Sequence, residues 1–195
     1  MRTDYNAAPM RLVRHVIPLL VLALVASVAH AADPVWDILK TDGSVVVMRH
    51  SFAPGGFDPP DARLDDCATQ RNLDESGRQQ ARLIGEAFRQ HGIEVGKVLS
   101  SPRCRCLDTA RLAFGRVESW GPLEGSLADA ELRRRRVDEI RKAISEHREG
   151  PPLVLVTHGS VVTDLTGLNV RMGEFVVLQR AADGTHSVAG RLYVE

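Results

Sequence analysis

The stretch Ser44-Val45-Val46-Val47-Met48-Arg49-His50-Ser51 decides the fold. Its short, wholly apolar and β-branched core predicts a strand buried on both faces, as in a parallel sheet. The strand ends on an arginine that is followed directly by a histidine. Because ligands bind just beyond the carboxyl ends of the strands in open α/β sheets, we expect chemistry at Arg49 and His50.

Two further stretches repeat this pattern of an apolar run that ends in basic residues. Val98-Leu99-Ser100-Ser101 leads into Pro102-Arg103-Cys104-Arg105, and Leu153-Val154-Leu155-Val156-Thr157 leads into His158-Gly159. Three predicted strands therefore end in Arg-His, Arg and His. Parallel strands place such residues at one edge of a sheet.

The first 31 residues predict a secretory signal peptide. A basic start precedes an apolar run over 16–28, and Ala29-His30-Ala31 forms a small-x-small cleavage site. The apolar run is shorter than the roughly 20 residues that a membrane span needs. Retention as an uncleaved N-terminal anchor is the alternative, and it is the one route to a membrane that we expect. Residues 32–195 are then a single domain, exported to the periplasm.

The charge of that domain gives it no general attraction to nucleic acid or to an anionic membrane. The chain has 25 basic and 25 acidic residues, and residues 1–31 hold three arginines and one aspartate. The remaining 22 basic and 24 acidic residues give a net charge of −2. A surface so close to neutral excludes a strong electrostatic preference for polyanions.

Three cysteines remain in the exported domain. An oxidising compartment favours a disulfide between Cys67 and either Cys104 or Cys106, which leaves one thiol over. No paired CxxC motif is present, so a structural zinc site is not expected, and we expect neither a metal nor another cofactor.

The remaining sequence alternates predicted helices and strands. We expect a short helix or arm over 34–39, helices near 74–91, 103–114, 129–147 and 160–168, and strands near 95–100, 153–157, 174–180 and 187–194. Residues 115–127 are expected to be irregular. Proline, glycine and aspartate residues over 52–72 predict a long loop that covers the end of the first strand. The fold class is α/β, a three-layer sandwich with a mostly parallel central sheet, helices on both faces and a closing antiparallel hairpin.

Two arginines and two histidines at three strand ends suit phosphoryl transfer. A phosphoryl group in transfer carries negative charge on three oxygens, so catalysis is mostly positioning and cationic stabilisation. The planar fork of arginine binds two oxygens at once and stays charged. A neutral imidazole can attack phosphorus and hold the group covalently.

At these positions the chain resembles the histidine phosphatase superfamily, which has the phosphoglycerate mutase-like fold. The matching motifs are Arg49-His50-Ser51, the helix opening 73–81, the stretch 101–110 and His158-Gly159. In the first motif the family has glycine where this chain has Ser51. The resemblance covers roughly residues 45–166, with the motifs in the family's order and spacing.

The resemblance implies roles for individual residues. His50 is the nucleophile that becomes phosphorylated, and Arg49, Arg105 and His158 clamp the phosphoryl oxygens. Arg103 competes with Arg105 for this assignment, but the interval to Thr109 favours Arg105. Ser160 begins a helix, whose N-terminus can add anion contacts.

The sequence leaves several candidates for the proton donor. Many family members use a carboxylate in the segment that follows the second motif, and Glu124 is the nearest match. Glu118, Asp129 and Asp164 are the alternatives.

The expected function is an exported, metal-independent phosphatase that hydrolyses phosphate esters through a phosphohistidine. The stretch 66–73 and Cys104-Arg105-Cys106 resemble a periplasmic branch associated with heptose-phosphate phosphatases of the lipopolysaccharide core. The expected partner is therefore a phosphorylated small molecule or an envelope glycan. The rival from another class is a periplasmic protein that binds or senses a phosphate ligand without turnover.

Overall fold

A computed structural model describes Met1, residues 34–125 and residues 129–194. The chain divides into two units, Met1–Ala31 and Ala32–Glu195, and the helices and strands of the described residues all belong to the second. Apart from Met1, the predicted signal peptide lies outside the described residues. Within the described ranges, no helix has the length and apolar character needed to span a membrane.

A six-stranded sheet with the order β3-β2-β4-β1-β5-β6 forms the centre of the domain. β1 (Val45–Arg49) and β4 (Leu153–Thr157) are parallel neighbours, and β2 (Val98–Ser100) continues the sheet beyond β4 in the same direction. At the other edge, β5 (Phe175–Arg180) and β6 (His186–Leu192) run antiparallel. The predicted parallel sheet with a closing hairpin is confirmed.

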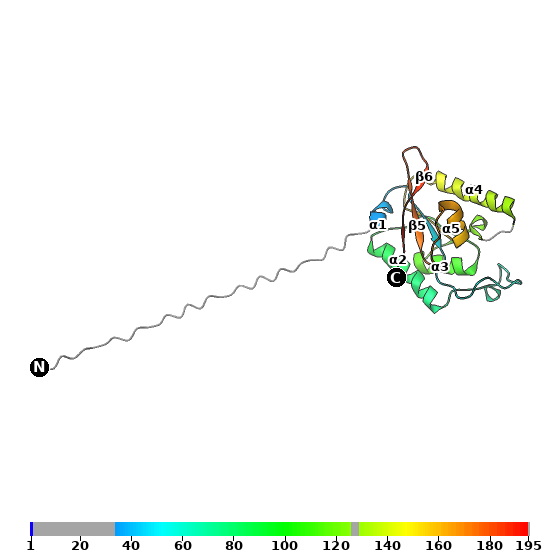
Figure 1. Cartoon of the computed structure of the whole chain (residues 1–195), viewed down its shortest axis with the longest axis horizontal. Helices are drawn as coiled ribbons and strands as arrows, with labels where there is room; N and C mark the ends of the chain where they lie inside the picture. The colour runs from blue at the N-terminus through cyan, green and yellow to red at the C-terminus, as the bar shows by residue number, and fades with distance from the viewer. Residues whose placement is uncertain (2–33, 126–128, 195) are drawn as a thin grey trace. The chain divides into compact units, whose positions relative to one another are not determined.

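Helices cover both faces of this sheet (Figure 1). Successive side chains of β1 point to opposite faces. Val46 and Met48 pack with α1, α2 and α3, whereas Val45 and Val47 pack with α4 and α5. The three predicted layers are therefore confirmed. The helices of the described residues are α1 (Pro34–Ile38), α2 (Glu75–Gln90), α3 (Cys104–Phe114), α4 (Ala130–Glu146) and α5 (Gly159–Thr166).

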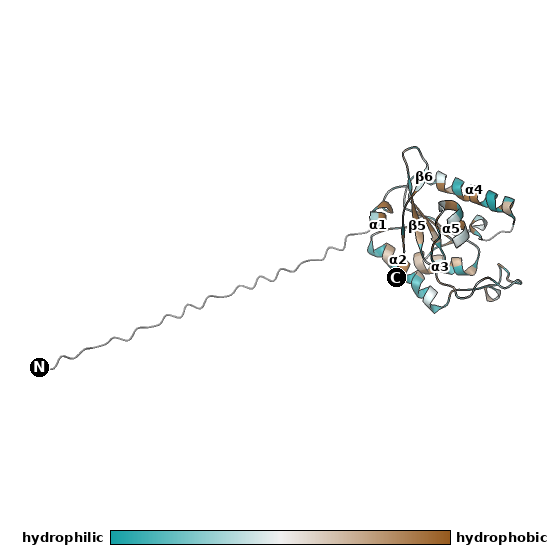
Figure 2. Ribbon diagram, in the orientation of Figure 1, coloured by the Kyte–Doolittle hydropathy of each residue, from teal (hydrophilic) through white to brown (hydrophobic). Residues whose placement is uncertain are grey.

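The outer helix α4 shows how these layers divide polar from apolar side chains. Figure 2 shows teal and brown residues alternating along α4. Its apolar side chains Ile140 and Ile144 are buried, while its arginines and carboxylates are exposed or half-buried. This four-residue spacing of buried side chains is typical of a helix that packs one side against a core.

The helix α2 begins where the sequence placed its cap. The Asp74 side chain accepts a hydrogen bond of 2.8 Å from the Gly77 backbone N–H, which satisfies a free helix donor. Gly77 lies against the loop that follows β1, since a Cβ there would collide with the carbonyl oxygen of Phe52. Glycine at this position therefore lets α2 pack directly beside the end of β1.

The long loop over 52–72 is irregular, as predicted, except for one 3-10 turn at Cys67–Thr69. A disulfide joins Cys67 in this loop to Cys104 at the start of α3. Cys106 is a buried free thiol. Of the two pairings that the sequence left open, the structure contains the one with Cys104, and it fixes the loop beside Arg105.

Two boundaries differ from the sequence prediction. Residues 115–127 were expected to be irregular, but they contain the two-residue strand β3 (Glu118–Ser119) and a 3-10 turn at Gly121–Leu123. β3 pairs with β2 at the edge of the sheet. An edge strand of two residues has no periodicity that a sequence pattern can reveal. β2 also begins at Val98, three residues later than predicted.

Candidate active site

The carboxyl ends of β1, β2 and β4 meet at one edge of the sheet. The His50 N–H donates to the Thr157 carbonyl, and the Ser101 N–H donates to the Val156 carbonyl, each at 2.9 Å. These bonds continue the strand pairing past the strand ends. The residues that follow the strands consequently line one cavity of about 750 Å³. Among the sequence candidates, it is lined by Arg49, His50, Arg105, His158 and Ser160.

His50 is buried and held in one orientation. Its Nδ1 lies 2.8 Å from the carbonyl oxygen of Ser51. A carbonyl only accepts hydrogen bonds, so Nδ1 carries the hydrogen of the neutral ring and Nε2 keeps its lone pair. Burial lowers the pKa of His50 to about 3, and the charges of Arg105, Arg71 and Arg49 lower it too, against the opposing Ser51 hydrogen bond. His50 is therefore neutral at pH 7, as a nucleophile must be.

His158 faces His50 across the cavity, with 5.5 Å between the ring centres. Its Nε2 lies 2.8 Å from the Ser101 hydroxyl oxygen and 3.6 Å from the Cys106 sulfur. Burial lowers the pKa of His158 well below its usual value, and the nearby His50 and arginines lower it further. The Ser101 hydroxyl can donate to Nε2 or accept from it, and when it donates, the neutral ring carries its hydrogen at Nδ1, where it can bind an oxygen atom.

Cys106 does not supply a second nucleophile. Burial raises the pKa of its thiol to about 12, despite the opposing charge of Arg105. The thiolate is the reactive form of cysteine, and at pH 7 this side chain is a thiol. Its role in the described structure is to pack beneath His158.

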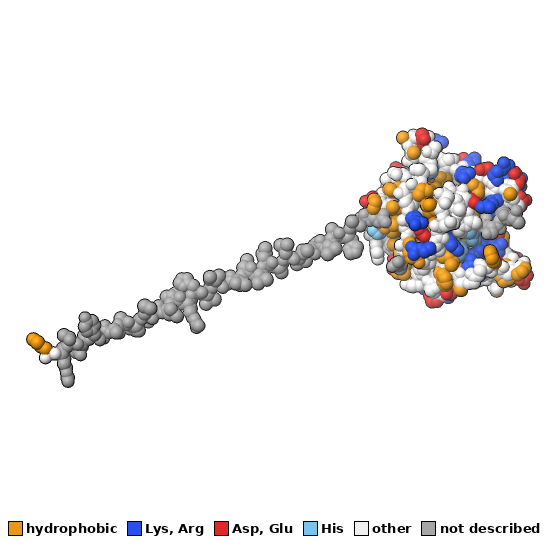
Figure 3. Space-filling view, viewed as in Figure 1, with side chains coloured by type: hydrophobic (Ala, Val, Ile, Leu, Met, Phe, Trp, Pro, Cys, Tyr) orange, Lys and Arg blue, Asp and Glu red, His pale blue; other side chains and the backbone are white. Residues whose placement is uncertain are grey.

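Four arginines surround the two histidines. Arg49 and Arg105 were predicted, and Arg71 and Arg103 line the cavity with them. On the side of the molecule that Figure 3 shows, blue basic side chains lie above and below a small pale-blue histidine surface. Each guanidinium holds a buried nitrogen with no hydrogen-bond partner among the described residues: Arg49 Nε, Arg71 Nε, Arg103 Nη1 and Arg105 Nε. Such a cluster of unsatisfied donors is suited to an anion with several oxygens.

Other nitrogens of these arginines donate hydrogen bonds to protein oxygens, and these bonds fix the orientation of the side chains. Arg49 Nη1 donates to the Val170 carbonyl at 2.9 Å, and Arg71 Nη1 donates to the Ala53 carbonyl. Arg103 Nη2 donates to Glu124 Oε1 at 2.9 Å. The guanidinium groups are thus held in place before any ligand arrives, which reduces the entropy that binding must overcome.

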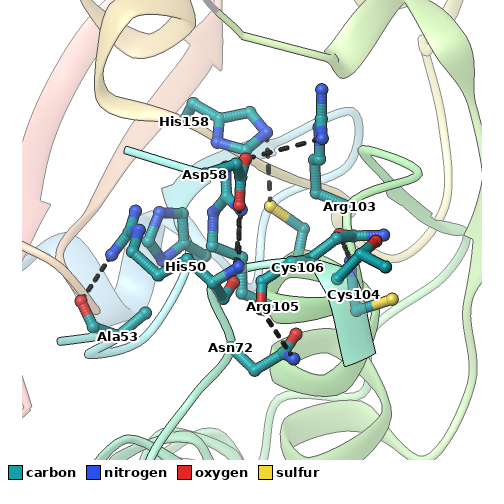
Figure 4. Close-up of polar contacts among 12 residues, drawn as sticks. His50, Ala53, Asp58, Asn72, Arg103, Cys104, Arg105, Cys106 and His158 are labelled. Carbon is teal, nitrogen blue, oxygen red and sulfur yellow. Dashed lines mark hydrogen bonds and ion pairs between the residues drawn. The ribbon is translucent and has the colours of Figure 1, made fainter. Parts of the chain in front are cut away.

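Asp58 is a cavity-lining carboxylate that the sequence interpretation missed (Figure 4). Its two oxygens lie 2.8 and 3.0 Å from Arg105 Nη1, and Oδ1 accepts from the Arg71 backbone N–H at 2.9 Å. Burial alone would raise the pKa of Asp58, but the Arg71 N–H and the charges of Arg105 and Arg103 hold it below its usual value. In the free protein Asp58 is therefore an anion beside the predicted phosphate clamp.

Glu124, the predicted proton donor, lies outside the residues that line the cavity. Its carboxylate is paired with Arg103 at 2.9 Å and with Arg136 at 3.5 Å. The alternatives Glu118, Asp129 and Asp164 also lie outside that lining. Glu118 pairs with Lys97 at 3.0 Å, Asp129 caps α4, and Asp164 is paired with Arg133. The structure therefore brings together every predicted site residue except the acid.

A sequence comparison and a structural comparison show what the chain is similar to. Residues 65–125 match the sequence model of the histidine phosphatase superfamily (branch 1). No curated protein matches the chain. The matched residues contain Arg71, Arg103 and Arg105 of the cavity.

Solved structures share the fold at low sequence identity. The protein histidine phosphatase SixA complexed with tungstate is 16% identical, with a TM-score of 0.58 over 77% of this chain and 96% of that chain. Phosphoserine phosphatase from Entamoeba histolytica is 12% identical, with a TM-score of 0.58 over 78% and 98%. A mycobacterial glucosyl-3-phosphoglycerate phosphatase is 17% identical, with a TM-score of 0.56 over 78% and 99%. Residues 65–125 are thus similar to the histidine phosphatase superfamily (branch 1), and the chain shares the fold of these solved phosphatases.

Proposed function

We propose that the protein hydrolyses phosphate esters through a covalent phosphohistidine at His50. The observation that carries this proposal is the set of four buried, unsatisfied guanidinium nitrogens around a neutral histidine. A buried donor without a partner costs about 1–3 kcal/mol. A phosphoryl group offers several oxygens to these donors and presents its phosphorus to Nε2 of His50.

The reaction has two displacement steps at phosphorus. In the first, the Nε2 lone pair of His50 forms a P–N bond while the ester P–O bond breaks and the alcohol leaves. In the second, a water oxygen attacks phosphorus and the P–N bond breaks, which releases phosphate and restores neutral His50. Arg49, Arg105 and the Nδ1–H of His158 stabilise the charge on the transferring oxygens in both steps.

We also propose that the enzyme is exported and acts on a phosphorylated small molecule or an envelope glycan. The support is the signal-like stretch 1–31 and the resemblance of 66–73 and 104–106 to periplasmic heptose-phosphate phosphatases. The disulfide between Cys67 and Cys104 is compatible with an oxidising compartment. Recovery of a chain that begins near Ala32 from the periplasmic fraction would support export, and an uncleaved chain in the cytoplasm would contradict it.

Phosphate release by the purified protein tests the activity. The panel contains sugar phosphates, aryl phosphates and a phosphohistidine peptide, each with and without EDTA. We expect release from at least one class, at a rate that EDTA leaves unchanged. If the folded protein binds phosphate but releases none from any substrate, the binding or sensing function replaces the enzymatic one.

Gly125 provides a test of the packing behind His158. A Cβ at Gly125 would lie 2.6 Å from Cβ of His158, so alanine there must displace the histidine. We expect Gly125→Ala to lower kcat/KM about 10- to 100-fold, because an orientation error near 1 Å has effects of this size. Gly121→Ala is the matched control, since a Cβ at Gly121 meets nothing within 4 Å. Equal activity of the two variants would show that His158 is not positioned by this contact.

A further inference from the structure

The reaction proposed above needs a proton for the leaving alcohol, and the structure offers a donor that the sequence interpretation did not name. An alkoxide is a poor leaving group, so the departing oxygen of an alkyl phosphate must be protonated as it leaves. The predicted donor, Glu124, does not line the cavity. Among the described residues that line it, Asp58 is the one carboxylate.

The contacts of Asp58 hold one of its oxygens less tightly than the other. Oδ1 accepts from Arg105 Nη1 at 2.8 Å and from the Arg71 backbone N–H at 2.9 Å. Oδ2 has the longer Arg105 contact of 3.0 Å and lies 3.5 Å from Arg103 Nη1. Protonation of Oδ2 therefore disturbs only these two longer contacts and leaves the two shorter hydrogen bonds of Oδ1 intact. The side chain is 16% exposed, so it is oriented by its partners while it remains open to the cavity.

The position of Asp58 in the cavity also fits direct contact with a bound ester. Figure 4 shows the contacts that join the Asp58 carboxylate to the side chains of Arg103 and Arg105. Its neighbours along the chain, Phe57 and Pro59, line the same cavity. An ester bound to the arginines thus has its phosphoryl oxygens and its leaving group beside this short segment.

We propose that Asp58 is the catalytic acid and base, which protonates the leaving oxygen and later deprotonates the attacking water. This inference rests on the phosphatase function proposed above. In the first step, the proton on Oδ2 moves to the ester oxygen as the P–O bond breaks and the P–N bond forms. In the second step, water gives a proton back to Asp58 while its oxygen bonds to phosphorus and the P–N bond breaks. The carboxyl group ends the cycle in its starting form, so atoms and charges balance.

Substrate binding itself promotes the acid form of Asp58. In the free protein the carboxylate is stabilised by the positive charges of Arg105 and Arg103. A phosphoryl group that binds these arginines shares their charge and places its own negative charge beside the carboxylate. Both effects favour a protonated carboxyl group. Because Arg105 and Arg103 contact both groups, binding of the phosphoryl group favours protonation of Asp58.

Asp58→Asn tests the proposal through its dependence on the leaving group. The assay compares kcat/KM for an alkyl phosphate, whose alcohol needs a proton, with kcat/KM for 4-nitrophenyl phosphate, whose phenolate does not. We expect Asp58→Asn to lose about 100-fold or more on the alkyl ester, the typical contribution of general acid catalysis, and roughly tenfold or less on the aryl ester. Asp61→Asn is the matched control, since it makes the same change at an exposed position of the same loop.

Each alternative role of Asp58 gives a different result. Equal losses on both esters would show that Asp58 only holds the loop, and higher kcat/KM on both would show that it competes with phosphate for the arginines. A selective loss in Glu124→Gln, with none in Asp58→Asn, would return the acid role to Glu124. Any of these outcomes overturns the proposal. Absence of turnover in the wild-type protein would instead refute the phosphatase function.

A folding defect is distinguished by a second variant and a second measurement. Asp58→Glu keeps a carboxyl group, so we expect it to recover activity on the alkyl ester relative to Asp58→Asn. Thermal unfolding and thiol titration report whether the fold and the Cys67–Cys104 disulfide survive each substitution. An Asp58→Glu variant that is folded and yet no more active than Asp58→Asn on the alkyl ester would also contradict the proposal.

Discussion

His50→Ala is expected to abolish phosphate release. The substitution removes the atom that forms the P–N bond, and the nearby Cys106 cannot replace it, because this side chain is a buried thiol at pH 7. Loss of an active-site nucleophile lowers kcat by several orders of magnitude, on the order of 10⁶ where it has been measured in a serine protease. The measurement is steady-state phosphate release with the best substrate of the panel.

The fold should survive this change. His50 makes its side-chain hydrogen bond only to the neighbouring Ser51 carbonyl among the described residues, so its removal breaks no hydrogen bond between distant elements. His186→Ala is a matched control, because His186 lies on β6 and outside the residues that line the cavity. We expect the control to keep wild-type activity. Full activity in folded His50→Ala would refute the assignment of the nucleophile.

Arg105→Ala is expected to reduce kcat/KM by about 10²–10³-fold, the effect of removing one preorganised donor to a developing charge. The Arg105 side chain is 8% exposed and carries both an unsatisfied Nε and the Nη1 that holds Asp58. Alanine therefore removes a phosphate ligand and releases the carboxylate beside it. Measurement of kcat and KM separately shows whether the loss lies in binding or in the chemical step.

Two variants sharpen the interpretation of Arg105. Arg105→Lys keeps the charge without the planar fork, so we expect it to recover only part of the lost activity. Arg111→Ala removes an exposed arginine from the same helix and serves as the control for charge and helix propensity. If Arg105→Ala and Arg111→Ala were equally active, Arg105 would not contact the phosphoryl group.

The strand-end residues were predictable because the sheet itself positions them. A buried β-branched strand in an α/β pattern favours a parallel neighbour, as β1 has in β4, and parallel strands end at the same edge. Arg49 ends such a strand, and His50 and His158 directly follow one, so their meeting required no knowledge of the loops. Arg105 needed in addition the family resemblance, in which the interval to Thr109 favoured Arg105 over Arg103.

Residues on irregular segments were not predictable in this way. Asp58 and Arg71 lie in the loop over 52–72, where no periodicity relates sequence distance to spatial distance. The sequence did show that the loop is unusually long for a compact domain, which marks it as functional without naming the residues that matter. Glu124 lies on a comparable segment, and its pairing with Arg103 and Arg136 depends on the packing of α4.

The choice between the two cysteines follows from helix geometry. Residues two apart on a helix differ in direction by about 200°, so Cys104 and Cys106 face opposite sides of α3. Cys104 faces the loop and bonds Cys67, whereas Cys106 faces His158. The spacing alone could not say which side faces the loop, and the pairing therefore stayed open until the structure placed α3.

The most direct test of the phosphohistidine is to trap it. The protein is mixed with a substrate labelled on phosphorus, quenched within milliseconds in alkaline denaturant and digested to peptides. We expect a label that is stable in alkali and labile in acid, carried by the peptide that contains His50 and absent from His50→Ala. A label on another residue, or equal labelling of the His50→Ala variant, would contradict the mechanism.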